Sequence, residues 1–152
     1  MGGKKVAGRK RHYLVDTEGH LLVAAVGPAD EDDRDGARCV FAARTQCWPD
    51  LQLVWADQHY TGDLEEEVQD LYGIHLEIVR KAAEQRGFVV LPRRWVVERT
   101  IAWQGRSRRL SKDYEHATEY SESWCYLASI QLLLKHLRPP RDAEVPYARK
   151  AA

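Results

Sequence analysis

The chain has 152 residues, of which 44% are hydrophobic, and its 23 lysines and arginines are balanced by 23 aspartates and glutamates. This length fits one domain that buries roughly two-thirds of the surface exposed by its unfolded chain. A net charge of zero gives no global reason to expect a nucleic-acid partner, so any such argument depends on where the charges lie.

Membrane and secreted proteins are excluded by the distribution of apolar residues. No apolar run approaches the roughly 20 residues of a membrane-spanning helix, and the basic start of the chain is not followed by the apolar core of a signal peptide. The three cysteines, Cys39, Cys47 and Cys125, show no CxxC spacing, which favours reduced thiols over disulfides or a zinc site. We therefore expect a cytoplasmic protein.

The first half of the chain predicts a basic arm, a hairpin, a helix and a strand. A short connection containing Gly19 joins two β-rich runs, as is typical of a hairpin. The later apolar run is nearly continuous, which predicts a strand buried on both faces. The expected ranges are 1–12 for the arm, 12–17 and 21–27 for the hairpin, 28–36 for an acidic loop, 37–47 for the helix and 51–57 for the strand.

The second half predicts further alternation and two final helices. Acidic residues early in 62–72 suit the positive end of a helix, and Gly73 is a candidate for its C-cap. This order of elements predicts an α/β protein with a mixed sheet flanked by helices. The remaining expected ranges are 74–81 and 88–91 for strands, 93–110 and 118–137 for helices, and 139–152 for a disordered tail.

Asp57 is the first candidate site residue, because it stands at the carboxyl end of the expected buried strand. Ligands of open α/β sheets bind at such strand ends. The alternative is that Asp57 only caps a helix or loop. His59 is either its neighbour in a site or an ordinary polar loop residue.

Glu98 is the second candidate, within an arginine-rich helix. In one interpretation Glu98 forms a surface ion pair worth a few tenths of a kcal/mol. In the other it binds a metal ion beside arginines that face a polyanion. Guanidinium groups bind phosphate through two parallel hydrogen bonds, and this segment contains arginine but no lysine, which favours phosphate contact over a solvated face. The arginines are Arg93, Arg94, Arg99, Arg106, Arg108 and Arg109, with Trp95 and Trp103 between them.

Four segments of the chain together resemble the catalytic domain of bacterial insertion-sequence transposases of the DDE type, in the insertion-sequence four and five group. They occur in the family's order between Gly3 and Leu137. The segments are GRKRHYLVDTEGHLL, PADEDDRDGA, LQLVWADQHYTG and GFVVLPRRWVVERTIAWQGRSRRLSKDYE.

The resemblance implies an RNase H-like fold with three carboxylates and two divalent ions, Mg²⁺ or Mn²⁺. The family's second Asp falls on Asp57 and its Glu on Glu98, so these are the expected catalytic residues and metal ligands. Leu91 and Gly105 stand where the family has a Tyr and a Lys. The expected DNA-binding residues are Arg94, which matches the family's Arg-x-x-x-Glu pattern, and Arg99, Arg106, Arg108 and Arg109.

The resemblance also implies that the first strand of the fold and its Asp are missing from this chain. The family's first Asp lies upstream of the GRKRH block, and Asp16 matches a different, non-catalytic Asp. Two-metal phosphoryl transfer holds its ions about 3.5–4 Å apart, so two carboxylates are expected to hold one ion weakly. Residues 13–138 would then form a partial catalytic domain.

Three functions stay open. The chain is the catalytic part of a transposase that acts after fusion or reassembly with an N-terminal part, or a non-catalytic fragment that binds DNA or a transposase as an inhibitor or remnant, or an unrelated α/β protein. Under the first two functions, the expected partners are the DNA of the element ends and of the target. A second copy of the chain or an N-terminal transposase part is also expected. These two functions place the protein in the cytoplasm, associated with the nucleoid.

Overall fold

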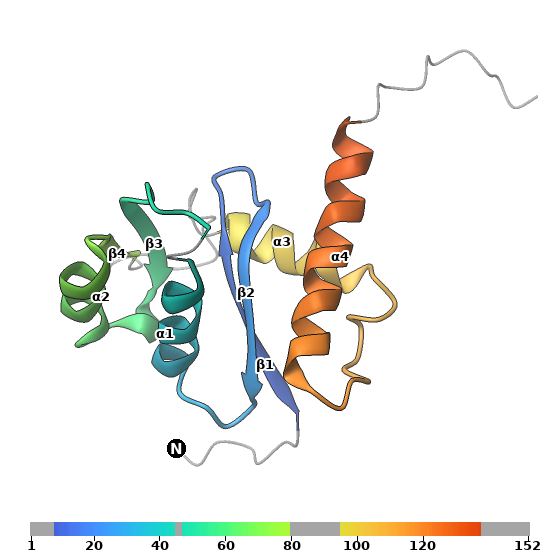
Figure 1. The fold of residues 1–152 in the computed structure, drawn as a ribbon, viewed down its shortest axis with the longest axis horizontal. Helices are drawn as coiled ribbons and strands as arrows, with labels where there is room; N and C mark the ends of the chain where they lie inside the picture. The colour runs from blue at the N-terminus through green and yellow to red at the C-terminus, as the bar shows by residue number, and fades with distance from the viewer. Residues whose placement is uncertain (1–7, 45–46, 80–94, 138–152) are drawn as a thin grey trace, which may run out of the picture.

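The computed structural model describes residues 8–44, 47–79 and 95–137. Over these ranges the elements follow the order expected from the sequence (Figure 1). The expected strand 88–91, Arg94 and the tail 139–152 lie outside the described residues. The elements are β1 (Arg9–Val15), β2 (Leu21–Pro28), α1 (Asp33–Arg44), β3 (Leu53–Asp57), the 3₁₀ turn η1 (Gln58–Tyr60), α2 (Leu64–Tyr72), β4 (His75–Val79), α3 (Trp95–Gly105) and α4 (Thr118–Leu137).

The described strands form two separate sheets instead of one continuous mixed sheet. Strands β1 and β2 pair antiparallel, with Tyr13 opposite Ala24, whereas β3 and β4 pair parallel, with Val54 opposite Leu76. Both parallel and antiparallel pairs are therefore present, as expected. No hydrogen-bonded ladder among the described residues joins β1 to β3.

The turn of the β1–β2 hairpin confirms the role expected for Gly19. One carboxylate oxygen of Asp16 accepts hydrogen bonds from the backbone N–H groups of Glu18 and His20, both at 2.8 Å. Gly19 has φ +86°, and a Cβ there would lie 2.8 Å from Thr100 Oγ1. Only glycine therefore fits the turn while allowing α3 to pack directly against it.

Helices α1 and α2 cover one side of the strands and enclose the main apolar core. Helix α1 begins at Asp33, four residues earlier than expected, because Asp33 and Asp35 are favourable in a first helical turn. Helix α2 ends at Gly73 in the left-handed conformation, φ +66°, which confirms the expected C-cap. The core consists of Ala37, Phe41, Leu64, Val68, Ile74 and Leu76.

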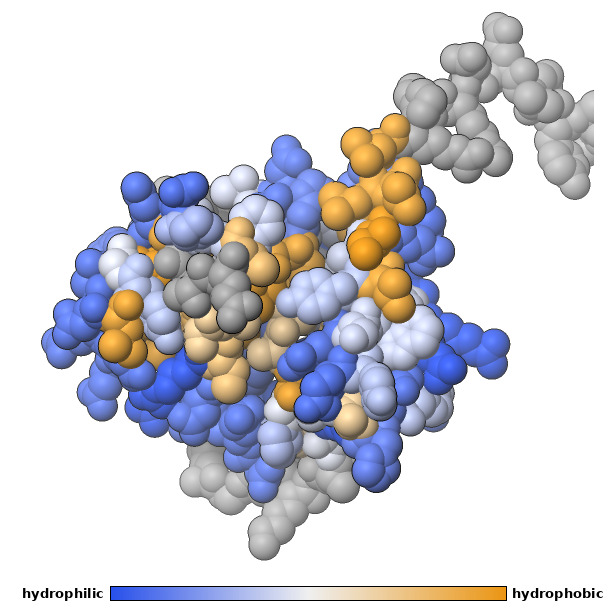
Figure 2. Space-filling view, in the orientation of Figure 1, coloured by the Kyte–Doolittle hydropathy of each residue, from blue (hydrophilic) through white to orange (hydrophobic). Residues whose placement is uncertain are grey.

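Helices α3 and α4 lie on the other side, where Tyr13 and Ala24 pack with Leu110 and Cys125 (Figure 1). Helix α3 buries polar residues, and its Gln104 side chain donates hydrogen bonds to Ser129 Oγ (2.6 Å) and to a carbonyl of α4. Helix α4 buries small residues at Ser121, Cys125 and Ser129. Its residues Leu127, Ile130, Leu134 and Leu137 are exposed. Figure 2 shows a hydrophobic, orange surface along the upper part of this helix.

The expectation that β3 is buried on both faces is wrong. Leu53 is 37% exposed and the rest of the strand is half-buried. Val54 and Ala56 pack against the core below α1 and α2, and every residue of the strand from Leu53 to Asp57 also lines an open cavity. The apolar run thus borders the core and the cavity together, and none of its residues is fully buried. None of the described helices is long and apolar enough to cross a membrane.

Candidate functional site

A cavity of about 770 Å³ lies between the two sheets and is the candidate site. Its walls come from β1, α1, β3 and the first turns of α3. Most of the lining side chains are apolar, but three carboxylates border it: Asp16, Asp57 and Glu98. The structure therefore brings both carboxylates expected from the sequence to one cavity.

Asp57 occupies the end of β3 and also caps η1. Its Oδ1 accepts a hydrogen bond from the backbone N–H of His59 at 2.9 Å, and its Oδ2 lies 3.2 Å from His59 Nδ1. Its side chain is 27% exposed. Asp57 thus caps η1, which is one of the two alternatives considered, and a carboxylate that accepts one backbone hydrogen bond keeps lone pairs free for another ligand. His59 is its direct neighbour.

Glu98 lies in the first turn of α3 and is exposed at the cavity. Its position is set by the residues that follow, since Thr100 Oγ1 donates to the carbonyl of Gly19 at 2.7 Å and Arg99 donates to the carbonyl of Glu18. These bonds fix the start of α3 against the β1–β2 turn. Glu98 consequently reaches the same cavity as Asp57 from an element far along the chain.

Asp16 borders the cavity but serves the hairpin turn. Its Oδ2 lies 3.0 Å from His20 Nδ1, in addition to its two bonds from backbone N–H groups. Burial by itself would raise the pKa of Asp16, but the hydrogen bonds from His20 and Glu18 outweigh it, so the pKa lies below its ordinary value. Asp16 therefore has a structural explanation of its own.

Carboxylate oxygens are the ligands that Mg²⁺ and Mn²⁺ prefer, so the chemistry of Asp57 and Glu98 fits such an ion. Their number does not fit a two-ion centre. Among residues 8–44, 47–79 and 95–137, no group of three His, Cys, Asp or Glu side chains is placed to hold a metal. Asp57 and Glu98 are thus two carboxylates that border one cavity without a third metal-ligating side chain placed beside them among these residues.

Of the expected DNA-binding arginines, the structure describes Arg99, Arg106, Arg108 and Arg109, and none of these four lines the cavity. Arg99 lies between two indole rings, with its guanidinium carbon 4.2 Å from the centre of Trp95 and 4.7 Å from that of Trp103. Its DNA contact stays a prediction that competes with these contacts. Helix α3 ends at Gly105, earlier than expected. The connection that follows it exposes Arg106, Arg108 and Arg109.

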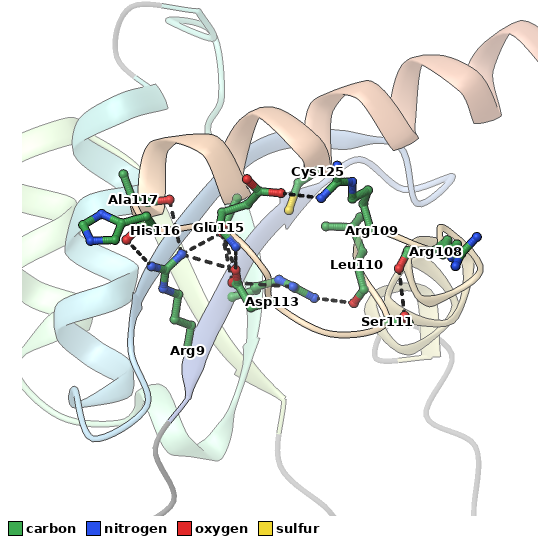
Figure 3. A network of polar contacts seen from close by, with 12 residues as sticks. Arg9, Arg108, Arg109, Leu110, Ser111, Asp113, Glu115, His116, Ala117 and Cys125 are labelled. Atoms are coloured by element: carbon green, nitrogen blue, oxygen red, sulfur yellow. Dashed lines mark hydrogen bonds and ion pairs between the residues drawn. The ribbon is translucent and has the colours of Figure 1, made fainter.

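Sequence reasoning missed a network that joins β1 to the start of α4 (Figure 3). Arg9 donates to Asp113 Oδ1 (3.3 Å), to Ser121 Oγ (2.9 Å) and to the carbonyl of His116 (2.7 Å). Arg11 lies 3.7 Å from the same carboxylate. These arginines therefore belong to the fold, although the sequence placed them in a basic arm. No pattern within the segments GRKRH and RRLSKDYE pairs Arg9 with Asp113.

A second missed group lies on the cavity wall, where His12 Nδ1 is 3.3 Å from Tyr60 Oη. His12 is 6% exposed, and burial lowers the pKa of its ring. Burial, together with the nearby charges of Asp33 and Asp57, raises the pKa of Tyr60 to about 12. Gly36 leaves the space for the ring, because a Cβ there would lie 2.2 Å from His12 Nε2. No motif in the sequence marks this pair.

Comparison with known proteins identifies a family for this chain. The family model described as Transposase DDE domain matches residues 1–129. No curated protein and no solved structure matches the chain. The matched range contains Asp57, Glu98, both sheets and the whole cavity wall. The chain belongs to the DDE transposase domain family.

Proposed function

We propose that this chain is the catalytic part of a bacterial insertion-sequence transposase of the four and five group, with residues 13–138 as a partial RNase H-like domain. The reaction is hydrolysis of a phosphodiester at the element end and transfer of the freed 3′-hydroxyl to target DNA. The observation that supports it best is the convergence of Asp57 and Glu98 on one cavity. Its place of action is the cytoplasm, at the nucleoid.

Asp57 and Glu98 would hold the metal, Mg²⁺ or Mn²⁺, in this proposal. The ion supplies Lewis acidity at phosphate oxygens and orients the reacting groups. His59 positions Asp57, because it binds both oxygens of that carboxylate. The third carboxylate comes from an additional polypeptide part, since Asp16 is committed to its turn.

Exposed arginines would bind the DNA backbone. Arg106, Arg108 and Arg109 lie close together in the chain, and Arg109 is 54% exposed beside Glu115. Guanidinium groups in such a position neutralise phosphate charge and release counterions. Replacing Arg106 or Arg108 by Ala should weaken DNA binding across sequences and lower the salt slope by about one each. An unchanged slope would make this segment a solvated surface.

The catalytic proposal is tested with the chain extended by the part encoded upstream of Met1, acting on DNA that carries both element ends. With Mg²⁺ or Mn²⁺, strand cleavage should fall at least about 100-fold in Asp57→Asn and in Glu98→Gln. Asp70→Asn, an exposed acid of α2 outside the cavity, is the matched control and should cleave normally. Cleavage that persists in both site variants would refute the proposal.

A non-catalytic fragment that binds DNA or a transposase is the second candidate. It is favoured by the absence of any three-ligand group in the described part of the chain. Stop codons or unrelated DNA upstream of the Met1 codon would support it, whereas a frame encoding an acid-bearing strand would support the catalytic part. Binding to element ends without cleavage under all metal conditions is its biochemical signature.

A further inference from the structure

Helix α4 has an inner face that packs within the fold and an outer face that is exposed along the helix. The inner face lies against β2 and α3 through the small buried residues Ser121, Cys125 and Ser129. Figure 2 shows a hydrophobic surface along the upper part of this helix. The apolar residues of the outer face, here called the outer row, are between 51% and 79% exposed: Tyr120, Leu127, Ile130, Leu134 and Leu137.

The outer row has the spacing of a coiled-coil seam. From Leu127 the steps are three, four and three residues, and Tyr120 stands one heptad before Leu127. Alternating steps of three and four keep apolar side chains on the side of a helix that faces a second helix. A helix that is only solvated on its outer side has polar residues there. The outer row therefore indicates a helical partner.

The area of the outer row suits a symmetric pair of helices. Side chains of this size at these exposures offer roughly 80–100 Å² each, so the row contributes about 450 Å² per copy and about 900 Å² in a pair. Flanking polar residues bring the total to about 1,000 Å², the lower limit for a specific interface. An interface of this size is expected to give micromolar affinity, since area alone does not yield tight binding.

Charges at the two ends of α4 select a second copy of this chain in antiparallel orientation. Glu119 is exposed at the start of the helix, and Lys135 is exposed in its last turn. When the outer row pairs about its middle, between Leu127 and Ile130, the start of one helix meets the end of the other. Each Glu119 then lies within one helical turn of the Lys135 of the second copy. A parallel pair would instead place like charges together and align the helix dipoles unfavourably.

We propose that α4 pairs with α4 of a second copy of this chain as an antiparallel two-stranded coiled coil, through the outer row. The same surface serves on both copies, as a two-fold interface requires. The cavity that holds Asp57 and Glu98 has no lining residue from α4, so pairing leaves the candidate site accessible. The pair forms without DNA or metal, and its failure would be separate from failure of the proposed catalysis.

The first test is the mass of the full chain in solution, by sedimentation velocity from about 1 to about 100 µM, which spans the expected affinity. The mass should rise from 17.5 kDa to twice that value. Leu127→Lys and Ile130→Lys, at positions half-exposed in the single chain, should each raise the Kd of the pair at least about 100-fold, because each buries unpaired charge in the seam. Leu71→Lys, at a 64% exposed site of α2, is the matched control and should pair like the parent.

Circular dichroism of the lysine variants checks that they fold as the parent does. A parent chain that stays monomeric at about 100 µM, or association that both variants of the outer row leave unchanged, would overturn the proposal.

The direction of pairing is tested by exchanging the end charges. Glu119→Lys and Lys135→Glu should each raise the Kd of the pair by about threefold or more, because each places like charges side by side. The double variant should restore the parental Kd, since acid and base have only exchanged places. Equal losses in the single and double variants would contradict antiparallel pairing.

Cross-linking tests the direction independently of charge. The background is Cys39→Ser with Cys47→Ser, which removes the two exposed thiols. Tyr120→Cys and Leu137→Cys chains, mixed and oxidised, should give disulfide-linked dimers that contain one chain of each kind, because these positions lie opposite each other in the antiparallel pair. Dimers made only of identical chains would show a parallel pair and overturn the proposal.

Discussion

Asp113 holds the connection between α3 and α4 on the sheet, and its replacement by Ala is expected to destabilise the fold. Its carboxylate accepts from Arg9 (3.3 Å) and, with both oxygens, from Ser121 Oγ (2.9 Å each), and it lies 3.7 Å from Arg11 Nη2 (Figure 3). Arg9 and Asp113 side chains are 20% and 19% exposed. Removing the acid leaves two guanidinium groups partly desolvated without their counter-charge.

The expected cost of Asp113→Ala is about 2 kcal/mol. Loss of one partner of a fully buried pair costs about 3–5 kcal/mol, whereas exposed pairs contribute about 0–1 kcal/mol. The network lies between these limits, because a fifth of each side chain is exposed and Arg9 keeps its bonds to the carbonyls of His116 and Ala117. Arg109→Ala, which breaks the 3.4 Å pair between the 54% exposed Arg109 and Glu115, is the matched control and should cost under about 1 kcal/mol.

The free energy of unfolding is measured by urea denaturation of Asp113→Ala, Arg9→Ala and the double variant. We expect a coupling energy of about 1 kcal/mol or more between Arg9 and Asp113. Arg9→Ala should also leave the salt slope of DNA binding unchanged, because its side chain is used within the fold. A destabilisation in Asp113→Ala no larger than in Arg109→Ala, or a reduced salt slope in Arg9→Ala, would refute the reasoning.

Two further predictions concern stability. The pKa of His12 is lowered from 6.5 by burial, so the unfolded chain takes up this proton first; stability should fall as the pH drops below 6.5 and change little on this account above it. Urea unfolding at several pH values checks this, and a His12→Asn variant with the same acid loss as the parent would contradict it. Leu64→Ala, at a fully buried site, should cost about 2–5 kcal/mol, against under about 0.5 kcal/mol for Leu71→Ala at a 64% exposed site of the same helix. Equal thermal denaturation of these two variants would disprove the assigned core.

Local structure in this protein could be predicted from residues that influence the backbone only over a few neighbouring positions. Gly19 and Gly73 marked a turn and a helix end, and acidic residues marked the start of α2, because positive φ and the helix dipole act within a few residues. Asp57 was predicted as a site residue from its position at a strand end and from the resemblance to the transposase family. The assignment to that family rests on the order of the segments along the chain and on the family match.

The tertiary structure alone decided which contacts these residues make across the chain. It placed Arg9 in a network with Asp113, and it separated the strands into two sheets on either side of the cavity. It also made α3 bury Thr100 and Gln104 instead of apolar residues. Each outcome depends on partners about 20 to more than 100 positions away in sequence, whose hydrogen-bonding groups must be satisfied wherever they are buried. Periodicity and charge along one segment carry no information about such partners.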